Sequence, residues 1–215
     1  WIMASADTNP ALQELERDLS PKFAAHVDRI TTNRPLFERV ETVWNARDKA
    51  GLTDEQARVL ERTYESFVRS GAQLEGAERE RMSAIKKRLA ELGTAFSQNV
   101  LADEAAFMLP LHDEADLAGL PDGLRQAMAA AAAERETDAP YVVTLSRSLI
   151  EPFLMFSERR DLREKAYAAW ISRGDNGNGT DNNAIIAETL ALRKEFADLL
   201  GFATYADYRL ANTMA

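Results

Sequence analysis

Apolar residues at alternating spacings of three and four constrain the fold of this chain more than any other feature. The clearest run is Met82, Ile85, Leu89, Leu92 and Phe96, with arginine and lysine between its members. Such spacing places the apolar side chains on one face of a helix, because an α-helix completes a turn about every 3.6 residues. The run predicts a helix that packs against antiparallel neighbours through a heptad-like seam, too short for a long coiled coil.

Local signals mark where further helices begin and end. Thr8 or Asn9 can cap a helix whose first residue is Pro10. Thr53 and Gln56 have the spacing of a capping box. The remaining boundaries that we predict are a break at Asn33–Pro35, a helix end at Gly51, helices that resume after Pro152, a cap at Asp181 or Asn182, a helix end at Gly201, and a final short helix from Thr204 and Asp207 through Tyr208.

The pattern changes in the middle of the chain. Ala105–Leu111 and Tyr141–Leu145 are short and apolar, and we expect both to be strands. Leu120–Glu136 between them is expected to be a helix, and the direction of strand pairing stays open. The predicted fold is therefore mainly α, with a small strand–helix–strand insert. The predicted segments are a helical part at 8–104, the insert at 105–147 and a second helical part at 148–215.

Composition excludes several classes of protein. The chain is 46% hydrophobic and 28% charged, which is ordinary for a soluble globular protein. Its net charge of −9 disfavours nucleic acid and anionic membranes as partners, because both require a positive surface. No apolar run is long enough to cross a bilayer. The absence of cysteine fits a reducing compartment, so we expect a cytoplasmic protein. Trp1–Met3 has no signal-peptide pattern and is expected to lie inside a longer protein.

The candidate metal ligands are few. The chain has two histidines, His26 and His112, and no His-Glu-x-x-His motif. Zinc needs three or four converging ligands, so we interpret both histidines as surface residues rather than ligands or bases. The polar loop Gly174–Asp181 lacks the Lys-Ser/Thr ending of a phosphate loop and the ligand spacing of a calcium loop. A connector between helices is the favoured role, with a mobile loop beside a binding cleft as the alternative.

Charged and aromatic residues also favour structural roles. Arg159, Arg160 and Arg163 could clamp a carboxylate, although a solvated helix face is the simpler interpretation. Carboxylates and basic residues alternate as on an exposed helix; they are Glu78, Glu80 and Glu91 with Arg79, Arg81 and Lys87. Five aromatic residues occupy positions that we predict to be core, namely Trp44, Tyr64, Phe67, Phe96 and Trp170. The residues themselves therefore indicate an acidic, mostly helical domain without a recognisable catalytic group.

Several stretches, in this order, resemble one family of enzymes. They are Leu36–Val40, Gly51–Gln56, Phe67–Leu74, Phe96–Leu101, Asp116–Pro121, Tyr141–Leu145, Arg159–Glu164, Asn183–Arg193 and Ala197–Ala206. Together they resemble the N-terminal half of the thimet-oligopeptidase family of zinc metallopeptidases, in its oligopeptidase A and peptidyl-dipeptidase branch. The resemblance covers residues 8–215.

The resemblance implies a helical enzyme with a deep channel that admits short peptides. In that family a His-Glu-x-x-His helix and a downstream glutamate hold zinc, and zinc lowers the pKa of its bound water to about 7. No position of this sequence matches those residues, so no catalytic, cofactor-binding or metal-binding residue is assigned here. We therefore expect a channel-forming segment that is inactive alone, and zinc only in its full-length parent.

Two functions follow from these observations. The first is a segment of a zinc oligopeptidase or peptidyl-dipeptidase whose partners are short peptides. The alternative is a non-catalytic helical module that binds peptides or a partner protein. Neither function involves nucleic acid or membrane. We also expect self-association, because a segment separated from its enzyme exposes apolar surface that promotes contact between copies.

Overall fold

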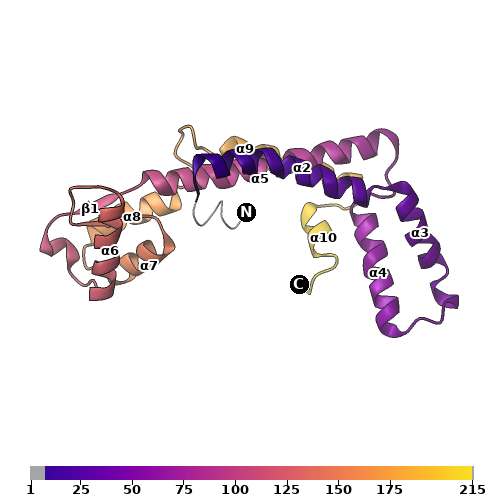
Figure 1. The fold of residues 1–215 in the computed structure, drawn as a ribbon, viewed down its shortest axis with the longest axis horizontal. Helices are drawn as coiled ribbons and strands as arrows, with labels where there is room; N and C mark the ends of the chain where they lie inside the picture. Colours follow the sequence, from indigo (N-terminus) through magenta and orange to yellow (C-terminus); the bar gives the residue numbers. More distant parts are fainter. Residues whose placement is uncertain (1–7, 215) are drawn as a thin grey trace. The chain divides into compact units, whose positions relative to one another are not determined.

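The computed structural model describes residues 8–214, and this part of the chain is mainly α-helical with one small sheet (Figure 1). Trp1–Met3 lies outside the described residues. The described chain forms two compact units. The first contains the residues up to Ala95 and those from Ile185 onward, and the second is Phe96–Ala184. The three predicted segments cut the chain at other positions and remain a prediction.

The first unit is built from helices. They are α2 (Pro10–Thr31), α3 (Arg34–Asn45), the 3-10 turn η1 (Arg47–Lys49), α4 (Asp54–Arg69), the first part of α5 (Gly76–Ala106), most of α9 (Asn183–Leu199) and α10 (Tyr205–Leu210). Helices α3 and α4 run side by side, and α2 lies along α5 (Figure 1). The core between α5 and α9 contains Met82, Ile85 and Leu92 from the predicted seam, with Leu192 and Phe196 opposite them.

The helix starts predicted at Asn9, Thr53 and Thr204 are confirmed. Asn9 accepts a hydrogen bond from the Leu12 amide at 2.9 Å, and Pro10 is the first helical residue. The capping box at Thr53 and Gln56 has both of its hydrogen bonds, at 3.0 and 3.3 Å. These caps form because the first amides of a helix have no partner inside the helix. Thr204 likewise caps α10 through the Asp207 amide at 3.0 Å.

The second unit contains the sheet and its own core. Strands β1 (Leu109–Leu111) and β2 (Tyr141–Val143) pair antiparallel, with Pro110 opposite Val142. Around them lie η2 (Glu114–Leu117), α6 (Asp122–Glu134), α7 (Arg147–Phe156), α8 (Arg160–Ile171) and the end of α5. Leu111, Met128, Val143, Ile150 and Phe153 are fully buried together. The strand–helix–strand insert is therefore confirmed, and its pairing direction is antiparallel.

Three predicted boundaries were wrong. Ala105 and Ala106 end α5 rather than begin a strand, because alanine continues the helix at no side-chain cost. The second helix ends at Asn45 and not at Gly51, since Arg47 donates to the Trp44 carbonyl at 2.9 Å and tightens the chain into η1. Helix α7 begins before Pro152. The proline removes one backbone hydrogen bond, and the burial of Ile150 and Phe153 offsets that loss.

Phe96 is the one seam residue that departs from the predicted core. It is 39% exposed, whereas Met82 and Ile85 are 0% exposed. It is also the residue at which the second unit begins, so the seam of the first unit ends one turn earlier, at Leu92.

Candidate functional site

Neither histidine lies in a metal site. His26 is on an exposed position of α2, and His112 is exposed after β1, where its backbone amide donates to Asp116 at 3.2 Å. Within residues 8–214, no group of three or more histidine, cysteine, aspartate or glutamate side chains could hold a metal ion. The donors of the described chain therefore do not fit zinc, which requires three or four convergent ligands.

The loop that contains Gly174–Asp181 is fastened to α5 by Asp103. The Asp103 carboxylate accepts hydrogen bonds from the Gly174 amide at 2.7 Å, from Asn176 at 2.8 Å and from the Thr180 hydroxyl. Burial raises the pKa of Asp103, but these donors outweigh it, so the pKa of the carboxyl lies below its ordinary value. An ionised, fully bonded carboxylate holds the loop, which favours the predicted connector role.

Asn182 completes the anchor of this loop. Its side chain is 1% exposed, donates to the Phe96 carbonyl at 3.2 Å and accepts from Asn99 at 2.9 Å. Gly174 has a φ of +73°, and a Cβ there would lie 2.7 Å from the Asn182 amide nitrogen. Only glycine fits this position without displacing Asn182. The sequence suggested Asn182 as a helix cap, but it did not indicate its burial.

The arginine cluster at 159–163 is engaged within the second unit. Arg159 pairs with Asp116 and with Asp161, the latter at 2.8 Å. Its guanidinium lowers the pKa of the Asp161 carboxyl, mainly through their hydrogen bond. Arg163 donates to the Ser157 carbonyl. Two of the three arginines thus bond to groups of the chain itself, which supports the structural interpretation over a carboxylate clamp.

Other charged side chains join helices that are distant in sequence. Arg81 binds Glu195 through two hydrogen bonds of 2.6 and 2.7 Å, and Arg88 binds Glu188 through two of 2.6 and 2.8 Å. Both bidentate pairs connect α5 with α9. The sequence predicted an exposed face of alternating charge on α5, and it did not indicate these partners.

Three of the five aromatic residues predicted as core pack together, and none of the five is fully buried. Trp44 stacks on Tyr64 at a centroid distance of 4.7 Å, and Tyr64 and Phe67 both stack against Phe37. Phe37 is 0% exposed and was not among the predicted aromatic core. Trp170 packs against the core of the second unit, with the Arg173 guanidinium 3.7 Å from its ring.

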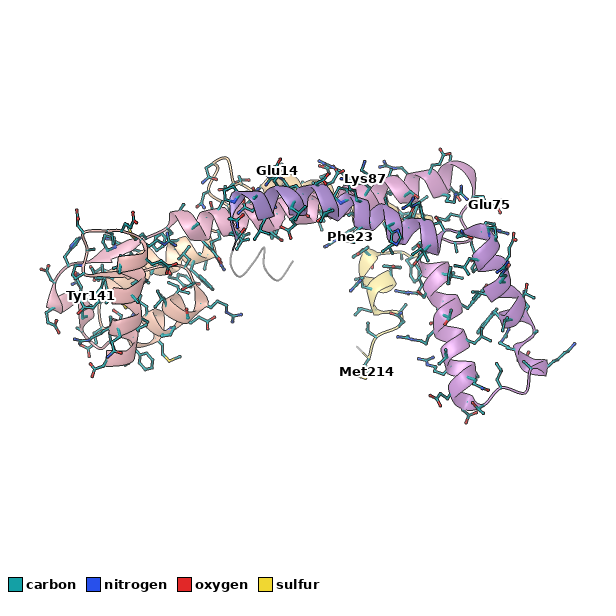
Figure 2. All side chains as sticks on the ribbon, in the orientation of Figure 1. Glu14, Phe23, Glu75, Lys87, Tyr141 and Met214 are labelled. Atoms are coloured by element: carbon teal, nitrogen blue, oxygen red, sulfur yellow. The ribbon has the colours of Figure 1, made fainter. Side chains whose placement is uncertain are left out.

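A basic pocket lies between α4 and α10. Its volume is about 430 Å³, and its lining residues are Arg62, Ser66, Arg69, Ser70, Tyr208, Arg209, Asn212 and Thr213. We call these eight residues the basic pocket. Met214, labelled in Figure 2, follows the last lining residue, Thr213, in the sequence. None of the lining residues is acidic, so the pocket is positive within a chain of negative net charge.

Contacts between the two helices fix the shape of the basic pocket. Arg69 donates to the Tyr208 carbonyl, and its guanidinium lies 4.4 Å from the centre of the Tyr208 ring. The Tyr208 hydroxyl donates to the Arg69 carbonyl at 3.3 Å. Burial raises the pKa of Tyr208, although Arg69 and Arg209 oppose the change, so the phenol stays protonated at neutral pH. Arg62 donates to the Asn212 carbonyl at 3.3 Å.

Sequence reasoning missed this pocket, although one signal was present. Arg62, Ser66, Arg69 and Ser70 are spaced by four, three and one, which places them on one helix face. The contribution of Tyr208 and Arg209 could not be read from the sequence, because α10 lies more than a hundred residues further along the chain.

An apolar groove of about 620 Å³ lies between α3 and α4. Its lining includes Val40, Val43, Leu52, Val59 and Leu60. Val43 is 50% exposed and Val59 is 61% exposed, so apolar side chains face solvent here.

Glu75, labelled in Figure 2, belongs to a separate polar pocket and pairs with Arg34 at 3.4 Å.

Comparison with known proteins identifies the relatives of this chain. The model of peptidase family M3 matches residues 153–215. The chain is 33% identical over 215 residues to a dipeptidyl carboxypeptidase of Escherichia coli, covering 100% of this chain and 32% of that protein. It is 31% identical to oligopeptidase A of Escherichia coli, with 98% and 32% covered, and 27% identical to saccharolysin of Saccharomyces cerevisiae, with 99% and 28% covered.

These matches confirm the resemblance to the thimet-oligopeptidase family. The kinship extends along the whole chain, while the chain spans about a third of the length of these relatives. No described helix is long and apolar enough to cross a membrane.

Proposed function

We propose, starting from this kinship, that the chain is a segment of a zinc-dependent metallopeptidase that hydrolyses short peptides, as an oligopeptidase or a peptidyl-dipeptidase. The observation that supports the proposal is the alignment of all 215 residues with dipeptidyl carboxypeptidase and 98% of them with oligopeptidase A. The segment contributes a wall of the substrate channel and is inactive alone. Zinc and its ligands belong to other parts of the enzyme.

The cytoplasmic location is also proposed. One plant relative bears the name probable cytosolic oligopeptidase A, and another is named as an organellar oligopeptidase A. The absence of cysteine is compatible with a reducing compartment such as the cytoplasm.

The proposal is tested by expressing the complete product of the gene beside the 215-residue chain. Intact mass and zinc content define each sample. The complete product is expected to hold about one zinc per chain, to cleave an internally quenched peptide of about ten residues, and to lose that activity to a chelator and regain it with zinc. The 215-residue chain is expected to show no cleavage. A complete product that binds no zinc and cleaves no peptide would rule the proposal out.

The alternative is a helical module that binds peptides or a partner protein without chemistry. The basic pocket and the apolar groove favour it, because both could hold a ligand although no described residues form a metal-ligand set. This alternative loses its support if the 215-residue chain binds no peptide while the complete product cleaves it.

A further inference from the structure

We propose that the basic pocket between α4 and α10 is a carboxylate-binding subsite for short peptides. The proposal rests on the proposed function in one respect, namely that the ligand is a peptide. The carboxylate comes from the C-terminus of the peptide or from an acidic side chain, and both sources present the same planar anion to the arginines.

The charge of the pocket carries the argument. The 215 residues contain 35 acidic and 26 basic side chains, so carboxylates outnumber their possible partners. Nevertheless, within the described part of the chain, no carboxylate forms an ion pair with Arg62, Arg69 or Arg209. Arginines drawn together at one place repel one another unless an anion lies between them. Three guanidinium groups without a carboxylate therefore indicate a site for an external anion.

Neighbouring residues show that local acids are used elsewhere. Arg58, one turn before Arg62 on α4, is paired with Glu61. Asp207, on α10, accepts a hydrogen bond from the Thr204 hydroxyl at 2.8 Å and forms no ion pair with a described arginine. The three arginines of the pocket thus have no carboxylate partner among the described residues, although acidic residues lie on the same two helices.

The residue types of the lining suit recognition of a carboxylate. A guanidinium can donate two parallel hydrogen bonds to one carboxylate, and the Ser66 and Ser70 hydroxyls lie in the same lining. Arg69 is held by the Tyr208 ring and carbonyl, so little rotamer freedom is lost on binding. Arg62 and Arg209 are exposed and can close on the ligand.

The size of the pocket sets the class of ligand. A volume of about 430 Å³ accommodates the end of a peptide, but not a folded protein. Nucleic acid is a poor candidate in spite of the arginines, because the chain as a whole carries a net charge of −9.

The experiment is a titration of the 215-residue chain, followed by calorimetry and by NMR amide shifts. The probes are three N-acetylated peptides: tri-alanine with a free C-terminus, tri-alanine amide, and Ala-Glu-Ala amide. We expect binding of tri-alanine acid or of Ala-Glu-Ala amide, or of both, which identifies the carboxylate source. We expect at least about tenfold weaker binding of tri-alanine amide, since it has no carboxylate.

Paired variants locate the site. The double variant Arg62→Gln/Arg209→Gln is expected to weaken binding of the acidic probe by about tenfold or more, while the matched control Arg58→Gln on the same helix leaves it unchanged. Circular dichroism confirms that each variant is folded. The proposal would be overturned if tri-alanine amide bound as tightly as both carboxylate probes, if Arg58→Gln caused an equal loss, or if the folded chain bound no probe. None of these results bears on peptide cleavage by the complete product, so the two proposals fail independently.

Discussion

Among the described residues of the first unit, Asp28 is the only acidic residue that is buried. It lies on α2, its side chain is 10% exposed, and it accepts hydrogen bonds from Lys86 at 2.6 Å and from the Ser83 hydroxyl. Lys86 also donates to the Ser70 carbonyl at 2.7 Å. This network ties α2 to α5 and to the turn after α4, so a single carboxylate connects three parts of the unit.

Replacing Asp28 by asparagine should therefore be costly. The change leaves Lys86 charged and only 19% exposed without its counter-ion, and we expect the free energy of unfolding to fall by about 3 kcal/mol or more. Urea denaturation measures the change. The control is Asp18→Asn, which breaks the exposed pair with Lys22 on the same helix and should cost less than about 1 kcal/mol. Similar losses for both variants would contradict the assigned role of burial.

Asp103 makes the stability of the second unit depend on pH. Folding lowers its pKa below the ordinary value of 3.8, so the folded carboxyl binds fewer protons than the unfolded one in acid. Its contribution is complete above the ordinary pKa and is lost as the pH falls through the lowered value.

We expect Asp103→Asn to lower the free energy of unfolding by about 2 kcal/mol at pH 7, because the amide group of asparagine would face donors. The difference in the free energy of unfolding between the variant and the unchanged chain should shrink as the pH falls below about 4. Denaturant midpoints across pH 7 to about 3 check this. A difference that stayed constant over that range would show that the carboxylate charge has no part in holding the loop.

At the scale of elements, the packing of α5 against α9 forms the core of the first unit. Ile85 is 0% exposed in this interface, whereas Ile186 on α9 is 42% exposed. Both residues are isoleucines within a helix. Their exposure differs because α9 presents only part of its surface to α5, and Ile186 lies outside that part.

Ile85→Ala is expected to lower the free energy of unfolding by about 2–5 kcal/mol, through lost burial and the cavity that remains. Ile186→Ala removes the same atoms from a half-exposed position and should cost less than about 1 kcal/mol. Thermal or urea unfolding of the two variants makes the comparison. If the two losses were equal, α5 and α9 would not pack as described.

At the scale of the whole molecule, apolar surface on α2 favours association. Leu15 is 50% exposed, Val27 is 56% exposed and Ile30 is 47% exposed on this helix. Exposed apolar side chains of this kind promote contact between copies. We expect the 215-residue chain to self-associate as its concentration rises.

Sedimentation velocity over a range of concentrations tests this expectation. The double variant Val27→Ser/Ile30→Ser should shift the chain toward monomer, whereas Met155→Ser, at a residue that is 72% exposed in the second unit, should not. A monomer at every concentration of the unchanged chain would contradict the prediction.

Much of the local structure could be predicted from the order of the residues alone. The caps at Asn9, Thr53 and Thr204, the seam from Met82 to Leu92 and the strands around Pro110 and Val142 were predictable, because each depends on neighbours within about one helical turn or on an alternation of side chains. The kinship with the peptidases was also predictable, since ordered stretches of sequence carried it.

Tertiary structure decided which of these residues meet. The burial of Asp28 against Lys86, the anchoring of the loop by Asp103 and the convergence of Arg62 and Arg69 with Arg209 all join positions more than fifty residues apart in the chain. Periodicity shows which face of a helix is apolar, but not which helix covers it or which charge lies opposite. Those contacts depend on the free energy of packing the whole unit, because a charge can be buried only where a partner for it is buried as well.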